Sequence, residues 1–126
     1  NVDQSDDGEG IQLLQVEGTD GETIADAERP QSFGFSSHPM PGAECVVVCV
    51  GASREQPVVI VVDDPERRPR GLKPGEVVVY DAFGQSIHMK DGETIAVKAS
   101  ATLAIDAPSV TMTGDLTVAG QVEDAN

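Results

Sequence analysis

The sequence predicts an all-β protein built from short strands. Val and Ile dominate its apolar positions, aromatic residues make up only 3% of it, and thirteen glycines and eight prolines interrupt it at short intervals. β-branched side chains favour pleated strands, and frequent glycine and proline indicate turns between short strands rather than helices. With 126 residues, the chain has room for one small domain and an extension.

Residues 1–10 predict a flexible acidic segment, because four of them are acidic and two are glycine. Residues 11–83 are expected to form a domain whose five short strands are typical of a compact barrel such as an OB-fold, with a small sandwich as the alternative. The expected strands are 11–16, 22–27, 45–50, 58–62 and 77–80.

Two of these expected strands, 45–50 and 58–62, are continuously apolar. Such runs predict strands that are buried on both faces. The intervening residues, 51–57, include Gly51 and Pro57 and predict a hairpin loop.

Residues 84–126 show a different pattern, in which aliphatic and polar residues alternate strictly. The first three aliphatic pairs recur every eight residues, and the later steps shorten to seven and six. A fixed repeat of very short strands is typical of a β-solenoid-like element. The positions expected to face its interior are Ile87, Met89, Ile95, Val97, Leu103, Ile105, Val110, Met112, Leu116, Val118 and Val122.

Such a ribbon is too thin to fold alone. One stripe of aliphatic side chains buries too little surface to offset the entropy of ordering about forty residues, and a lone ribbon leaves both sheet edges unpaired. Three ribbons wound about one axis would bury the stripe and pair every edge. The pattern therefore predicts a homotrimer with a β-prism or triple-stranded β-helix, which the shortening repeat would narrow toward its end.

The charge of the chain excludes some partners. A net charge of −14 disfavours nucleic acid and anionic membrane surfaces as ligands. The only basic cluster is Arg67, Arg68 and Arg70. We expect it to dock on an acidic neighbouring subunit.

No arrangement of residues predicts catalysis or a cofactor. His38 and His88 have no suitable partner nearby in the sequence, and the adjacent Asp63 and Asp64 would face opposite sides of a strand. Phosphate loops, dinucleotide fingerprints and EF-hand spacing are also missing from the sequence. We therefore predict no catalytic, cofactor-binding or metal-binding residue, and a protein that is not an enzyme.

Four stretches resemble the Mu-type phage baseplate assembly protein V family. Residues 32–44, SFGFSSHPMPGAE, are similar to its YGFSSxPxPGAE stretch, and residues 67–77, RRPRGLKPGEV, to its RPxxLKPGEV stretch. YDAFGQ at 80–85, followed by IHM at 87–89 and DG at 91–92, resembles its transition into the spike. TMTGDLTVAG at 111–120 resembles its closing TVTGDLTVxGxV repeat.

The resemblance implies a trimeric central spike of a contractile phage tail. The OB-fold-like domain would dock on the baseplate hub and tail-tube proteins. The triple-stranded β-helix would be driven through the host outer membrane when the sheath contracts. The expected location is the tail baseplate of the virion, after assembly in the host cytoplasm.

Spikes of this family usually end in an apex with an HxH motif that holds iron. This sequence ends at residues 123–126 without that motif, so the apex is expected to be missing and no metal ligand is assigned. Two alternatives to the phage spike remain open. One is a non-enzymatic OB-fold adaptor of a related injection machine, such as a tailocin or type VI-like tip. The other is a tail-associated cell-wall hydrolase.

Overall fold

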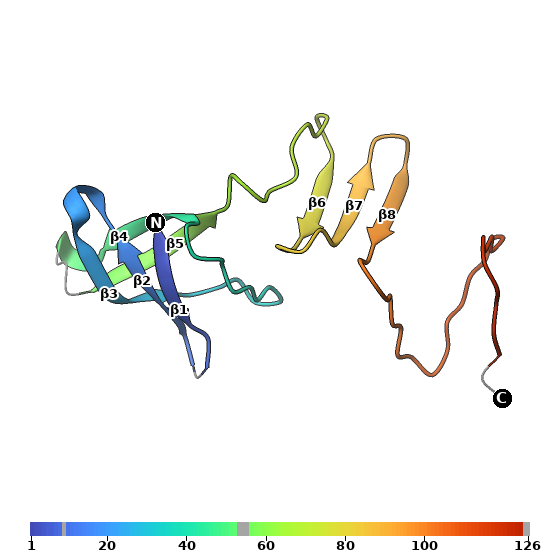
Figure 1. Ribbon diagram of the computed structural model, residues 1–126, viewed down its shortest axis with the longest axis horizontal. Coiled ribbons are helices and arrows are strands. Elements are labelled where there is room, and N and C mark those ends of the chain that lie inside the picture. Colours follow the sequence, from blue (N-terminus) through green and yellow to red (C-terminus); the bar gives the residue numbers. More distant parts are fainter. Residues whose placement is uncertain (9, 53–55, 125–126) are drawn as a thin grey trace.

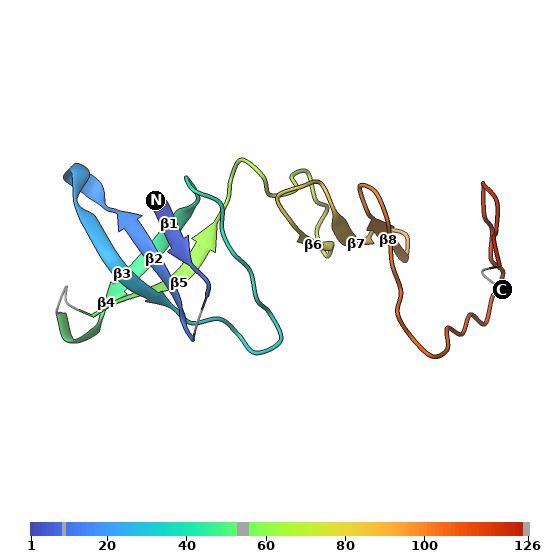
Figure 2. The ribbon, with the colours of Figure 1, turned by 60° about the horizontal axis from the view of Figure 1, so that its bottom comes forward.

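The computed structural model describes residues 1–8, 10–52 and 56–124. Its regular elements are eight strands in two sheets and two short 3-10 helices, η1 (Thr19–Gly21) and η2 (Val50–Ala52), with no α-helix in the described residues. The prediction of an all-β protein is therefore confirmed. The molecule is elongated, with a five-stranded sheet at one end, a three-stranded sheet beyond it and an extended C-terminal tail (Figures 1 and 2).

The five-stranded sheet has the order β1-β2-β3-β5-β4. All neighbouring strands are antiparallel except β3 and β5, which are parallel. Strand pairing does not close the sheet into a barrel. However, Val2 in the edge strand β1 donates its N–H to the Ala43 carbonyl at 2.7 Å and accepts the Gly42 N–H at 2.8 Å, just before β4. The strands are β1 (Val2–Asp6), β2 (Gln12–Glu17), β3 (Thr23–Arg29), β4 (Glu44–Cys49) and β5 (Pro57–Asp63).

A small aliphatic core lies on the inner face of this sheet. Alternation along β2 points Leu14 and Val16 inward, where they meet side chains from the other strands. Each core residue is at most 2% exposed, and four partly buried hydrophobic side chains, Ile24, Cys45, Val47 and Val62, pack against this core. The core consists of Val2, Leu14, Val16, Ala27, Ala43 and Val59.

The prediction of a flexible segment at residues 1–10 is wrong for residues 2–6, which form β1. Val2 pairs with Val16 of β2 and enters the core, while the exposed or half-buried polar residues that follow it complete an antiparallel hairpin. Val2 is the only aliphatic residue among the first ten. The segment therefore lacked the repeated apolar alternation that predicts a strand.

Replacing Leu14 by Ala should destabilise the five-stranded sheet by about 2–5 kcal/mol, because a fully buried leucine leaves a cavity. Leu14 is 1% exposed. The free energy of unfolding in urea measures the effect. The control is Leu13→Ala at the adjacent, half-buried position, for which a smaller loss is expected. Equal losses in the two variants would contradict the assignment of Leu14 to the core.

The predicted hairpin from β4 to β5 is confirmed, although residues 53–55 of its loop lie outside the described residues. The predicted burial of both faces is wrong for the single chain. Val46, Val48, Ile60 and Val61 point outward and are 43–57% exposed. The ladder shifts register between Val46 and Val47, opposite the extra residue Ile60, so Ile60 and Val61 both become exposed.

The second sheet contains β6 (Val77–Tyr80), β7 (Ser86–Lys90) and β8 (Thr94–Lys98) in an antiparallel meander. The sequence placed residues 77–80 in the first domain, but β6 pairs only with β7. The reason is the short turn between them. The Asp81 carboxylate accepts the Gln85 side-chain amide at 2.6 Å and the Phe83 N–H at 2.9 Å, and these bonds lower the Asp81 pKa.

Residues 99–124 contain no strand in the single chain. All of them are exposed except Ala99, and they form the extended tail of Figure 1. Strand ladders require a neighbour to accept their main-chain hydrogen bonds. The β-helix expected for this region is therefore not formed by one copy and stays a prediction.

Candidate functional site: an exposed aliphatic face

One face of the three-stranded sheet is covered by six aliphatic side chains. The register aligns them in two rows across the strands. Each is exposed by 39–66%, although large aliphatic side chains are normally inside a fold. We call this surface the aliphatic face; its rows are Val77–Met89–Ile95 and Val79–Ile87–Val97.

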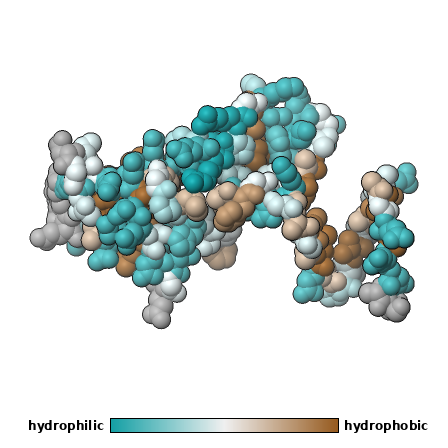
Figure 3. Space-filling model, in the orientation of Figure 1, coloured by the Kyte–Doolittle hydropathy of each residue, from teal (hydrophilic) through white to brown (hydrophobic). Residues whose placement is uncertain are grey.

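Four of the eleven predicted interior positions meet on the aliphatic face. Val77 and Val79 complete it, and the sequence analysis missed them because it assigned their strand to the first domain. Their alternation continues that of β7 and β8, and this signal could have identified them. The remaining seven positions lie in the tail, where Figure 3 shows hydrophobic surface, and all are exposed: Leu103, Ile105, Val110, Met112, Leu116, Val118 and Val122.

The whole chain exposes far more surface than a compact monomer. Its accessible surface is 10193 Å². A compact monomer of 13.2 kDa exposes about 6,400 Å². The excess of about 3,800 Å² is comparable to the area that obligate protein interfaces bury. The arrangement therefore suits association rather than an independent monomer.

Glu76 fixes the start of β6 to the turn between β7 and β8. Its carboxylate accepts the Asp91 N–H at 2.7 Å and the Lys73 N–H at 3.1 Å, and lies 3.4 Å from Nε2 of His88. The side chains of Lys73 and Asp91 form an ion pair at 3.4 Å beside it. The bond from Asp91, followed by that from Lys73, holds the pKa of Glu76 below its ordinary value.

This geometry gives His88 a neighbour, Glu76, that its sequence context did not reveal. His88 lies on the face opposite the aliphatic face and is only 25% exposed. Its Nε2 is buried and makes no hydrogen bond, and its ion-pair partner in the described residues is Glu76. The Glu76 carboxylate therefore positions the hairpin.

Acid should loosen this attachment. A depressed pKa means that the contribution of Glu76 to stability is fully present above its ordinary pKa. That contribution is lost as the pH falls through the lower pKa of the folded state. Protection of the Asp91 amide, measured as the ratio of its intrinsic to its observed hydrogen-exchange rate, should therefore fall over that acidic range. In Glu76→Gln, the Asp91 amide should exchange faster than in the wild type already at neutral pH, and its protection should show no acid step. The control Asp115→Asn, in the tail, should show the same acid step as the wild type. An unchanged acid step in Glu76→Gln would contradict the attachment.

The three arginines expected to dock on a partner lie in the linker between the two sheets. Arg67 is held by the Asp64 carboxylate at 3.0 Å and is two-thirds buried. Arg68 and Arg70 are exposed, and their guanidinium groups donate only to the main-chain carbonyls of Pro69 and Pro65, respectively, within the described residues. Two of the three cations thus remain free to meet a carboxylate.

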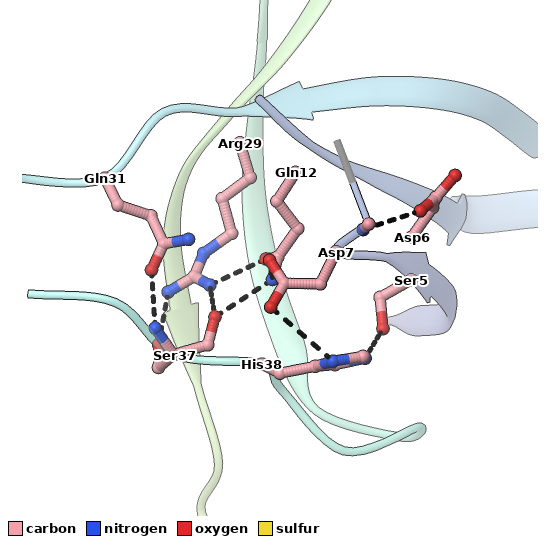
Figure 4. Close-up of polar contacts among 9 residues, drawn as sticks. Ser5, Asp6, Asp7, Gln12, Arg29, Gln31, Ser37 and His38 are labelled. Carbon is pink, nitrogen blue, oxygen red and sulfur yellow. Dashed lines mark hydrogen bonds and ion pairs between the residues drawn. The ribbon is translucent and has the colours of Figure 1, made fainter. Parts of the chain in front are cut away.

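The loop at 30–42 is fastened to the five-stranded sheet by a polar cluster (Figure 4). Arg29, at the end of β3, donates to the Ser37 carbonyl at 2.9 Å and to the Gln12 side-chain oxygen at 2.8 Å. Gln12 in turn donates to the Asp7 carboxylate and the Ser37 carbonyl, both at 2.9 Å. Gln12 is only 3% exposed, and these bonds satisfy its amide.

The same cluster gives His38 partners that the sequence did not reveal. Nε2 of His38 contacts the Ser5 hydroxyl, and its Nδ1 lies 4.0 Å from the Asp7 carboxylate (Figure 4). A Ser–His–Asp triad needs a hydrogen bond between base and carboxylate in a sheltered site. Here that distance is too long, and the His38 and Asp7 side chains are 53% and 41% exposed. The contact therefore anchors the loop.

No group of three or more His, Cys, Asp or Glu side chains among the described residues is arranged to hold a metal ion. Within the same residues, none of the helices is long and apolar enough to cross a membrane.

Comparison with known proteins places the chain in a class of bacteriophage Mu-type proteins. The family described as Bacteriophage Mu Gp45, N-terminal, matches residues 1–66. The baseplate puncturing device gp45 of Escherichia phage Mu is 39% identical over 124 residues, covering 93% of this chain and 63% of that protein. The Mu-like prophage FluMu protein gp45 of Haemophilus influenzae is 34% identical over 122 residues, covering 86% of this chain and 66% of that protein.

The chain therefore belongs to the Mu Gp45 family. It spans a little under two thirds of the length of these two relatives. No solved structure matches it. The expected Mu-type baseplate family is confirmed, under the description Gp45 rather than assembly protein V.

Proposed function

We propose that this chain is part of the central spike of a contractile phage tail and works as a homotrimer in the virion baseplate. Sheath contraction would drive the spike through the host outer membrane, and the protein would act mechanically rather than as an enzyme. Membership of the Mu Gp45 family supports this proposal, as does the name of the phage Mu relative, a baseplate puncturing device.

The five-stranded sheet would serve as an OB-fold-like docking domain. Its strand order, with a parallel contact between β3 and β5, is that of a five-stranded Greek-key barrel of this kind. The main-chain bonds of Val2 to residues 42 and 43 bring the two edge strands together where such a barrel would close. We propose that this domain binds the baseplate hub and tail-tube proteins.

The second sheet and the tail would form the spike. In Figure 1, β6, β7 and β8 run across the long axis of the molecule, as the rungs of a triple-stranded β-helix would. Three copies would bring their aliphatic faces together on one axis and give the tail strands neighbours to pair with.

The observation that carries the trimer is the aliphatic face, with six aligned side chains left exposed in one copy. Sedimentation equilibrium of the purified protein tests it. The expected mass is three times 13.2 kDa, in a species that resists heat and detergent. A monomer at all concentrations would sink the proposal.

One observation favours a second candidate, an OB-fold adaptor of a related injection machine. Phe33 and Phe35 are fully and 71% exposed, respectively, on the anchored loop, as expected for residues that bind a partner. The candidates differ in what a Phe33→Ser/Phe35→Ser variant should do. If the protein is an adaptor, this variant should no longer bind its partner, while the chain is otherwise unchanged. If the protein is a spike, the variant should still form the heat-stable trimer.

A further inference from the structure

The outer face of β4 and β5 carries an apolar patch that one copy leaves uncovered. Its four members are Val46, Val48, Ile60 and Val61, each about half exposed. They lie side by side, since Val46 is directly opposite Val61 in the ladder and Ile60 is the extra residue of the register shift. These residues come from continuously apolar runs, which are typical of strands covered on both faces.

Two carboxylates extend this patch at one end. Glu44 of β4 and Asp63 of β5 are directly opposite each other, and both are exposed. Like charges in this position repel each other across a ladder. Neither side chain has a cationic partner among the described residues, so the pair is suited to receive cations from another molecule.

The chain itself carries matching cations. Arg68 and Arg70 are exposed and bond only to main-chain carbonyls of their own linker. Hydrogen bonds from the Arg67 and Arg68 N–H groups to the Asp64 carbonyl, at 3.2 and 2.9 Å, fold this linker into a turn. The two guanidinium groups are thus presented on a shaped segment, which limits the entropy lost when they bind.

Position favours a second copy as the partner. The linker leaves the end of β5 at Asp63, so Arg68 and Arg70 follow Asp63 of the carboxylate pair by only a few residues (Figure 1). Copies arranged around a common axis can therefore pair the linker of one with the sheet of the next, as a closed ring requires. Each copy also carries a charge of −14, so assembled copies repel one another unless cations meet carboxylates.

We propose that Arg68 and Arg70 of one copy bind the Glu44–Asp63 pair of its neighbour, while the neighbour's patch of Val46, Val48, Ile60 and Val61 is covered by the same contact. The contact rests on the trimer proposed above and adds to it an interface outside the spike. It makes assembly of the five-stranded sheets dependent on salt, because the pairs lie near solvent.

Charge reversal tests the contact in the full chain. Arg68→Glu/Arg70→Glu should raise the trimer dissociation constant at least tenfold, measured by sedimentation in mild denaturant at low salt, and the difference should shrink at high salt. Lys90→Glu/Lys98→Glu makes the same change in net charge on the second sheet and should have less than a threefold effect. Adding Glu44→Arg/Asp63→Arg to the first variant should restore at least half of the lost affinity on a logarithmic scale.

The apolar part has its own variant. Val46→Thr/Val61→Thr keeps the shape and strand preference of both residues but places hydroxyls in the patch. This variant should weaken the trimer at least threefold at every salt concentration, with the circular dichroism of the folded chain unchanged. If the wild-type protein is a trimer and the arginine reversal does not weaken it, this contact alone is overturned and the surface is assigned to another protein. A wild-type monomer would overturn both this contact and the trimer itself.

Discussion

Replacing Leu103 by Asp is expected to prevent assembly of the tail. Leu103 is 61% exposed in one copy, so a single chain tolerates a carboxylate there. In the proposed trimer, threefold symmetry places three carboxylates together on an apolar axis. Burying an unpaired charge costs several kcal/mol per ion. The dissociation constant of the trimer should therefore rise roughly a thousandfold or more, equivalent to about 4 kcal/mol.

Thr102→Asp is the matched control, because it adds the same charge one residue earlier. Neighbouring residues of a strand point to opposite faces, so this carboxylate would face solvent. Sedimentation and resistance of the trimer to heat should then match those of the wild type. If Leu103→Asp formed an equally heat-stable trimer, the inward orientation of Leu103 would be wrong.

Alternation predicted correctly which side chains share a face in β7 and β8. The paired aliphatic residues of β7 and β8 were expected on one face, and the register places them there. Segments with a single apolar residue gave no such signal. Residues 2–6 became a strand because Val2 finds Val16 across the ladder, a contact over fourteen residues that no local pattern encodes.

The polar contacts show the same limit. Glu76 holds the Asp91 amide, and Ser5 meets His38, although these partners lie 15 and 33 residues apart. Sequence reasoning assigned no role to Glu76 and no partner to His38, because their neighbours are set by the folding of turns and loops. It also assigned β6 to the wrong sheet, since a strand's residues indicate its faces but not which strand it pairs with.

The position of β6 leads to the second large effect. If β6 contributes to the spike axis, Val79→Asp should abolish the trimer while leaving the five-stranded sheet folded. Val79 is 52% exposed and lies in the row with Ile87 and Val97, so three copies would again bury three carboxylates. We expect a monomer by sedimentation, with the amide protection of β2 and β3 retained.

Ser86→Asp is the control for this variant, since it adds the same charge to the same sheet. Ser86 lies on the opposite face, beside Lys98 across the ladder, where a carboxylate gains a cationic neighbour. The trimer should persist in this variant. Because Val79 and Ser86 belong to one hairpin, simple damage to the sheet would affect both variants. Loss of assembly in Val79→Asp alone would place β6 on the trimer axis, whereas a Val79→Asp trimer as stable as the wild type would show that Val79 does not face that axis.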